Sequence, residues 1–154
     1  MLAYPVSDKP IDYTKPVFIQ PKLDGVRCLI QYDNSTVTAY SRTGKEWKNI
    51  YHILRHLVPF FQKYPDVILD GELYNHAFKD DFESIISMVR KQKPTMQDRL
   101  KSADNVQFHC YDIVDETKSF EQRNNFITQA VPRNHCIKHV ETTQCFTEGD
   151  AKIF

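Results

Sequence analysis

The chain has 154 residues, of which 41% are hydrophobic and 26% are charged, so it can bury one hydrophobic core but hardly two. Its 20 Lys and Arg residues balance its 20 Asp and Glu residues, which excludes an overall positive field and leaves only a local patch for any nucleic-acid contact. Because no apolar run approaches the roughly 20 residues that span a bilayer, we expect no membrane role.

Residues 17–40 read VFIQPKLDGVRCLIQYDNSTVTAY, which predicts three extended stretches. Turn-forming residues separate them at Asp24-Gly25 and at Asp33-Asn34-Ser35, so we expect an antiparallel meander. Apolar residues from Trp47 to Phe61 then recur at helical spacing and predict a helix with one face on a sheet. Pro59 should kink or shorten the last turn of this helix.

Residues 66–74 (DVILDGELY) predict another strand, and apolar residues at 82–89 mark a second amphipathic helix. A charged and exposed segment is expected at 91–105, after which VQFHCYDIV predicts a strand. A third helix should open at Ser119, whose side chain is suited to an N-cap. Strands and helices in unequal alternation indicate an α+β fold.

The last residues, TEGDAKIF, predict a helix that opens with Thr147 as its N-cap. Because so short a helix is barely stable alone, we expect the chain to be truncated on its C-terminal side. The four cysteines include no Cys-x-x-Cys pair and the N-terminus shows no leader, which indicates a reduced, cytoplasmic protein. Five histidines show no metal-ligand spacing with the cysteines, so no structural zinc site is expected and the first two should lie on a solvated helix face. These are His52, His56, His76, His135 and His139.

The hexapeptide KLDGVR at 22–27 is the most informative motif. Strand alternation places Lys22 and Asp24 on the same side, and Gly25 should let the chain turn with a positive φ. Arg27 then returns along the neighbouring strand, so that an amine, a carboxylate and a guanidinium converge on one pocket. The alternative is a solvated hairpin turn, because Asp-Gly commonly closes hairpins.

Two later strands carry further candidates. Asp70 and Glu72 should share one strand face opposite Leu69 and Leu73, and paired carboxylates on such a strand are costly without a cation or hydroxyl partner. In VQFHCYDIV, alternation places Tyr111, with His109 and Ile113, opposite the core side. Tyr111 would then offer a flat surface to a base, the alternative being a half-buried sheet tyrosine.

The order of four motifs resembles the covalent nucleotidyltransferase superfamily, and specifically its ATP-dependent DNA ligases. The motifs are KLDGVR at 22–27, SRTGK at 41–45, LDGEL at 69–73 and FHCYDI at 108–113. The resemblance implies an α+β, antiparallel-sheet-rich nucleotidyltransferase (ATP-grasp-like ligase adenylation) domain. Residues 1–154 would be a partial adenylation domain, truncated on its C-terminal side and without the oligonucleotide-binding barrel. Arginine at the sixth position of the first motif resembles the ATP-using enzymes, so ATP is the implied cofactor.

The resemblance also implies residue roles. Lys22 would attack the α-phosphate of ATP to form lysyl-AMP, and the AMP would pass to the 5′-phosphate of nicked duplex DNA before the 3′-hydroxyl seals the nick. This chemistry requires a neutral amine, which cations such as Arg27, Arg42 and bound Mg²⁺ would favour. Asp24 would act in nick sealing near the 3′-hydroxyl, and Asp24 and Glu72 are the expected metal ligands.

The remaining implied roles concern the nucleotide. Arg27 and Glu72 would hold the ribose hydroxyls, Tyr111 would stack on the adenine and Gln20 would lie beside the adenine edge. The planar guanidinium of Arg42 would meet the phosphate of the AMP or of the nick, a task for which Lys is less suited.

The family continues with a Glu-Gly-x-x-x-Arg/Lys strand and a Lys-x-Lys motif, and neither occurs here, because Glu148-Gly149 fits a helix better. We therefore expect residues 1–154 alone to show little or no self-adenylation. Only about twenty residues precede Lys22, which favours a phage or viral type of ligase acting in the host cytoplasm, with no obligate protein partner. An RNA ligase, a capping-type nucleotidyltransferase and a non-catalytic nucleotide- or nucleic-acid-binding remnant are the alternatives.

Overall fold

The computed structural model describes residues 9–153, which form two compact units. The terminal unit comprises residues 9–21 and 141–153, and the sheet unit comprises residues 22–140. In the terminal unit, β1 (Val17–Ile19) pairs antiparallel with β7 (Thr143–Cys145), and α5 (Glu148–Ile153) follows. The hydroxyl of Thr147 accepts the backbone N–H of Asp150 at 3.2 Å, so the predicted opening of this helix is confirmed.

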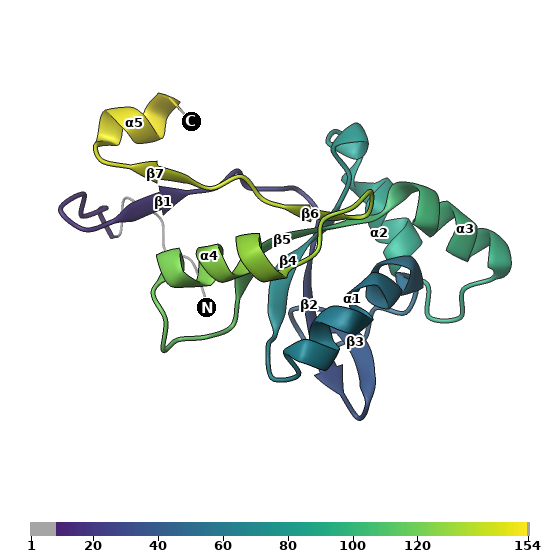
Figure 1. Ribbon diagram of the computed structural model, residues 1–154. Coiled ribbons are helices and arrows are strands. Elements are labelled where there is room, and N and C mark those ends of the chain that lie inside the picture. Colours follow the sequence, from purple (N-terminus) through teal and green to yellow (C-terminus); the bar gives the residue numbers. More distant parts are fainter. Residues whose placement is uncertain (1–8, 154) are drawn as a thin grey trace. The chain divides into compact units, whose positions relative to one another are not determined.

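The sheet unit is built on a five-stranded sheet with the strand order β3-β2-β4-β5-β6 (Figure 1). The pairs β3–β2, β2–β4 and β4–β5 are antiparallel, whereas β5 and β6 are parallel. This mixed but mainly antiparallel sheet confirms the predicted α+β class. The strands are β2 (Val26–Asp33), β3 (Thr36–Tyr40), β4 (Leu69–Tyr74), β5 (Gln107–Ile113) and β6 (Ile137–His139).

The helices of the sheet unit, apart from that at Met96–Asn105, contribute to one apolar cluster with the sheet. Cys28 and Ile30 of β2 belong to this cluster and are fully buried, as is Ile53 of α1. Burial of such side chains contributes about 1.5–3 kcal/mol each. The helices are α1 (Tyr51–Lys63), the 3₁₀ helix η1 (His76–Phe78), α2 (Phe82–Val89), α3 (Met96–Asn105) and α4 (Phe120–Ala130). No helix in residues 9–153 has the length and apolar character of a membrane span.

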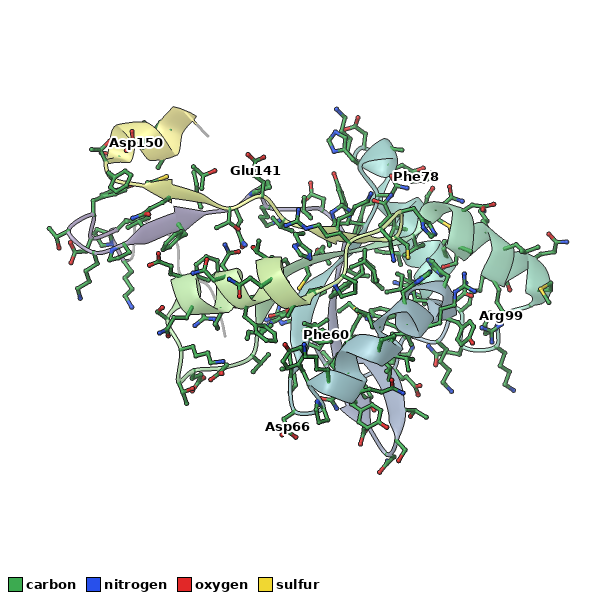
Figure 2. All side chains as sticks on the ribbon, viewed as in Figure 1. Phe60, Asp66, Phe78, Arg99, Glu141 and Asp150 are labelled. Carbon is green, nitrogen blue, oxygen red and sulfur yellow. The ribbon has the colours of Figure 1, made fainter. Side chains whose placement is uncertain are left out.

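Aromatic side chains join α1 to α4. The ring of Phe60, labelled in Figure 2, lies 5.3 Å from that of Tyr64 and 6.2 Å from that of Phe126 on α4. Tyr64 and Phe126 meet edge to face at 5.1 Å. Such pairs stabilise by about 0.5–1.5 kcal/mol beyond the area they bury. The predicted start of α4 is also confirmed, because Ser119 forms a capping box with Gln122.

Two predictions from residues 17–61 are wrong. The stretch at 17–19 pairs with β7 and not with β2, so the three stretches form no meander, although the hairpin that turns at Asn34 and Ser35 is present. Both turn residues have positive φ, 49° and 66°, as a two-residue hairpin requires. The α1 helix begins after Trp47 and continues through Pro59 to Lys63, so Pro59 does not shorten it, and a kink at Pro59 stays a prediction. The pairing of β1 with β7 joins segments far apart in the sequence, so the local sequence pattern does not encode it.

Other differences lie in the second half of the chain. The charged segment at 91–105 contains α3, which Thr95 and Asp98 open with a reciprocal capping box. Only Ser102 of this helix is buried, so the sequence lacks the apolar periodicity from which a helix is predicted. The three-residue strands β6 and β7 were not predicted. His52 and His56 are half-buried and not on a solvated face, because the ring of His52 contacts the Val106 carbonyl at 2.8 Å.

Candidate functional site

An open pocket of about 380 Å³ lies where the segment before β2 meets β4. It contains three of the predicted site residues, Lys22, Asp24 and Glu72. The other residues that line it are Leu23, Gly25, Lys79, Asp80 and Phe82. An amine and carboxylates thus share one pocket, whereas the guanidinium of Arg27, which the motif was also predicted to place there, does not line it.

Lys22 is held only loosely at the pocket. Its Nζ lies 3.5 Å from Oδ1 of Asp24, and the two side chains are 91% and 68% exposed. An ion pair this exposed contributes little to stability. The amine is therefore accessible to a ligand.

Gly25 brings this segment close to β4. A Cβ at Gly25 would collide with the carbonyl oxygen of Leu73, so no other residue fits without a shift of the backbone. The Gly25 N–H donates to Oε2 of Glu72 at 3.2 Å. The prediction of a positive φ at Gly25 is wrong, since Gly44 is the glycine with positive φ among the described residues. The role of Gly25 is close approach between two segments.

Glu72 is half-buried on β4, and burial raises the pKa of its carboxyl from 4.5 to about 7. The hydrogen bond from the Gly25 N–H and the charges of Lys22 and Arg27 lower this pKa, while Asp70 raises it. Glu72 consequently exchanges its proton near neutral pH. Perturbed carboxyls in clefts are typical of functional sites.

The raised pKa of Glu72 predicts a pH-dependent cost of folding. Between pH 4.5 and 7 the unfolded chain loses this proton first, so stability falls as pH rises and the cost is complete above pH 7. At 1.36 kcal/mol per pKa unit, and discounted for partial exposure, the cost is roughly 1–2 kcal/mol. The stability of Glu72→Gln relative to the unsubstituted chain, measured by urea unfolding, should therefore increase by these roughly 1–2 kcal/mol as the pH rises from 5 to 8.

The matched control for this measurement is Glu83→Gln, which changes an exposed carboxyl on α2. Its stability difference from the unsubstituted chain should stay constant across the same pH range. A constant difference for Glu72→Gln as well would show that the Glu72 carboxyl does not titrate near neutral pH.

Arg27 and Asp70 form a bidentate ion pair beside the pocket. Nε and Nη2 of Arg27 donate to Oδ1 and Oδ2 of Asp70 at 3.1 and 2.7 Å. Asp70 is 4% exposed, and Arg27 is the cation that its burial requires. The guanidinium of Arg27 thus offsets the energetic cost that we predicted for two carboxylates on one face of β4. The sequence placed Asp70 on the same strand face as Glu72 but assigned it no role in the site.

Tyr111 lies near this pair because of a β-bulge. Asp70 pairs with Asp112 and Gly71 with Cys110, so Tyr111 is the extra residue of β5. Burial raises the pKa of its hydroxyl, and the charges of Asp70 and Glu72 raise it further. The bulge also corrects the predicted alternation, because Ile113 returns to the core side and is 3% exposed.

Four predicted residues do not line the pocket, namely Arg27 and Tyr111, described above, together with Arg42 and Gln20. Arg42 is exposed in the tight turn 41–45, where the Ser41 N–H donates to the Lys45 carbonyl at 2.6 Å and Gly44 adopts φ +91°. Gln20 belongs to the terminal unit, where its amide donates to the hydroxyl of Thr142 at 2.9 Å. Their assigned roles stay predictions.

The pocket also contains residues that the sequence did not single out. Lys79 and Asp80 follow η1, and Phe82 begins α2 with Asp81 as its N-cap. The charged run before the predicted helix at 82–89 was the available signal. Asp24, Glu72 and Asp80 contribute carboxylates to the lining of the pocket, and the expected role of Asp24 and Glu72 as metal ligands stays a prediction.

Comparison with known protein families and solved structures identifies similarity to DNA ligases. A family model described as "ATP dependent DNA ligase domain" matches residues 1–154. A solved structure of a Lig E DNA ligase has a TM-score of 0.70 and 19% identity, and the match covers 99% of this chain and 54% of that one. A search among curated protein sequences finds no match.

Two further solved structures are similar in fold. The ATP-dependent DNA ligase of bacteriophage T7, in complex with ATP, has a TM-score of 0.59 and 15% identity over 90% of this chain and 52% of that one. The Chlorella virus DNA ligase-adenylate has a TM-score of 0.56 and 20% identity over 85% and 45%. The chain thus spans about half the length of these three structures.

Proposed function

The chain belongs to the family of ATP-dependent DNA ligases, and from this premise we propose that it carries the nucleophile-bearing part of a ligase adenylation site, with Lys22 as the nucleophile. The observation that carries the proposal is an exposed lysine in a pocket that also holds Asp24 and the proton-exchanging Glu72. A solvated hairpin turn, the alternative for KLDGVR, accounts for neither the pocket nor the contact of Gly25 with Glu72.

In the proposed reaction, the lone pair of the neutral Lys22 amine attacks the α-phosphorus of ATP. An N–P bond forms, the bond to the bridging oxygen of pyrophosphate breaks, and the amine proton passes to solvent. The product is a lysyl-AMP phosphoramidate. The 5′-phosphate of a DNA nick then displaces Lys22 and takes the AMP, and the 3′-hydroxyl displaces AMP as the nick closes. Asp24 is proposed to act near that hydroxyl.

Asp24 and Glu72 are proposed to hold Mg²⁺ in this pocket, because Mg²⁺ is usually bound by one or two carboxylates together with substrate phosphates. When bound, the ion would withdraw charge from the phosphate oxygens. Glu72 has to be ionised for this role, and the charges of Lys22 and Arg27 favour that form.

The nucleoside is proposed to lie against the Arg27, Glu72 and Tyr111 side chains. Arg27 is held by Asp70 in one orientation, which supports a positioning role for its guanidinium toward the ribose. Tyr111 is half-buried and offers the aromatic surface on which adenine would stack. Gln20 is proposed to contact the adenine edge.

Arg42→Ala should slow nick sealing by the gene product roughly tenfold to a hundredfold, because one guanidinium contact to a phosphate is lost. Arg42→Lys should be intermediate, since an ammonium cannot bind two phosphate oxygens side by side. The measurement is single-turnover sealing of a labelled nicked duplex. Lys45→Ala is the matched control in the same exposed turn and should seal normally. An unchanged sealing rate in Arg42→Ala would remove Arg42 from the site.

The proposed activity is tested by substrate comparison. The gene product is incubated with Mg²⁺ and α-labelled ATP or GTP, and then with duplexes nicked in DNA or in RNA. Covalent label from ATP followed by sealing of nicked DNA is the expected result. Label from GTP would indicate a capping-type enzyme, sealing only of RNA an RNA ligase, and no label a non-catalytic nucleotide- or nucleic-acid-binding protein. We place this activity in the cytoplasm, of the host if the gene is phage-encoded.

A further inference from the structure

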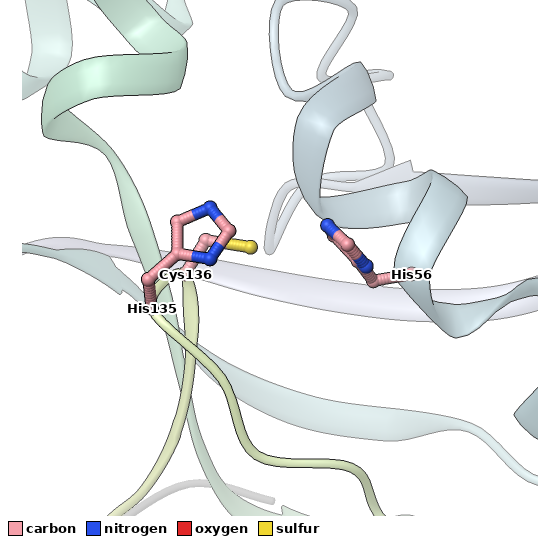
Figure 3. A group of neighbouring side chains, drawn as sticks. All are labelled: His56, His135 and Cys136. Atoms are coloured by element: carbon pink, nitrogen blue, oxygen red, sulfur yellow. The ribbon is translucent and has the colours of Figure 1, made fainter.

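A second group of chemically active side chains lies away from the pocket. His56 projects from α1, and His135 and Cys136 precede β6. One ligand atom of each, two imidazole nitrogens and a thiol sulfur, lies within 4.8 Å of the others. Figure 3 shows Cys136 and the ring of His135 turned toward the helix that carries His56. These residues are far apart in the sequence, so the fold alone brings them together.

The environment of His56 is unusual. Its Nε2 is enclosed and has no hydrogen-bond partner among the described residues. Its ring meets that of His135 edge to face, with 5.8 Å between the ring centroids. An enclosed polar atom without a partner is unfavourable and calls for a compensating ligand. Since His135 is exposed, a small ion can reach the group from solvent.

Cys136 is fixed in place by its own loop. Oδ1 of Asn134 accepts the N–H groups of Cys136 and Ile137, each at 2.9 Å. The buried thiol donates to the same Oδ1 at 3.2 Å and to the His52 carbonyl at 3.7 Å. The backbone of Cys136 is therefore held before any ion binds, which reduces the entropy lost on binding.

We propose that His56, His135 and Cys136 form a binding site for a zinc-class transition-metal ion. Two imidazoles and a thiolate are ligands of borderline softness, which Zn²⁺ and Co²⁺ prefer and Mg²⁺ does not. Donor atoms around a tetrahedral zinc lie about 3.3–3.6 Å apart, given its bond lengths of about 2.0–2.3 Å, so modest side-chain rotation closes the group. The S–H bond of Cys136 breaks, its proton goes to solvent, and water completes the fourth position.

The ion would join α1 to the connection between α4 and β6. His52, one turn earlier on α1, already uses its ring on the Val106 carbonyl at 2.8 Å and stays outside the group. Because the ion binds the folded chain and finds no assembled site in the unfolded one, it should raise the melting temperature. The prediction of no structural zinc site rested on local spacing, whereas these ligands come from α1 and from the segment before β6, which only the tertiary fold brings together.

The test uses the purified chain after chelator treatment and dialysis, titrated with Co²⁺ and then with Zn²⁺. We expect one Co²⁺ per chain, a thiolate-to-metal charge-transfer band, displacement by Zn²⁺ but not by excess Mg²⁺, and a rise in melting temperature with Zn²⁺. His135→Ala and Cys136→Ser should each weaken binding more than the roughly 10–100-fold that loss of an outer partner costs. Because His135 is exposed, its variant should fold normally, and circular dichroism checks this.

Two matched controls complete the design. His76→Ala removes another exposed histidine, and Cys145→Ser alters another buried cysteine. Both should bind Co²⁺ with unchanged affinity and an unchanged charge-transfer band. The proposal is overturned if the unsubstituted chain gives no thiolate band, or if His135→Ala retains full affinity. It is also overturned if Cys145→Ser abolishes the charge-transfer band while Cys136→Ser retains it.

Discussion

Lys22→Ala is expected to abolish covalent AMP labelling of the gene product, by more than about a thousandfold, because no other amine can replace the nucleophile. Stability should change by less than about 0.5 kcal/mol, since the Lys22 side chain is 91% exposed and its partner Asp24 is exposed as well. The measurement is the label from α-labelled ATP that survives denaturation, together with a urea unfolding curve of each protein.

Lys22→Arg and Lys79→Ala serve as the controls for this prediction. Lys22→Arg retains the positive charge but supplies no nucleophilic amine, so it should also remain unlabelled. Lys79→Ala removes the other lysine of the same pocket and should retain the adduct. Persistence of the adduct in Lys22→Ala, or its loss only in Lys79→Ala, would contradict the assignment of the nucleophile.

Arg27→Ala is expected to have the largest effect on stability. It leaves the carboxylate of Asp70, which is 4% exposed, without its bidentate partner. Removing one member of a buried ion pair costs about 3–5 kcal/mol, a large part of the roughly 5–15 kcal/mol that stabilises a typical domain. Urea unfolding should show a correspondingly lower midpoint.

The double variant Arg27→Ala/Asp70→Ala separates the loss of the Arg27 side chain from the penalty of leaving the Asp70 charge unpaired. Because it removes the uncompensated charge, it should recover part of the lost stability. Lys118→Ala is the control for an exposed pair, since Lys118 is 47% exposed beside Asp115, and should cost no more than about 1 kcal/mol. Equal losses in Arg27→Ala and Lys118→Ala would show that the Arg27–Asp70 pair contributes no more than a surface pair.

The local elements of the fold were largely predictable from the sequence. The cap at Ser119, the hairpin turn at Asn34 and Ser35 and the apolar periodicity of α2 are each encoded within a few residues. The pairing of β1 with β7 was not predictable, because it joins segments at opposite ends of the chain and a three-residue strand has no usable period. The α3 helix was missed because only Ser102 in it is buried.

The site was predictable to a similar extent. Lys22, Asp24 and Glu72 share a pocket as the motifs indicated, although Lys22 and Asp24 lie in the irregular segment before β2 and the close approach of Gly25 to β4 brings them to Glu72. The engagement of Arg27 by Asp70 was not predictable, since it depends on the register of β2 against β4. The position of Tyr111 depends on a bulge that no local pattern announces. The convergence of His56 with His135 and Cys136 depends likewise on tertiary packing.

The most direct test of the central claim is to locate the AMP on the chain. The gene product is incubated with Mg²⁺ and ATP, denatured and digested, and the modified peptide is sequenced by mass spectrometry. Lys22 as the nucleophile predicts one AMP on the peptide that contains KLDGVR, attached to Lys22 by an acid-labile and alkali-stable N–P bond. AMP on another residue, or no adduct in a folded gene product that carries this pocket together with the Glu-Gly-x-x-x-Arg/Lys and Lys-x-Lys motifs, would contradict it.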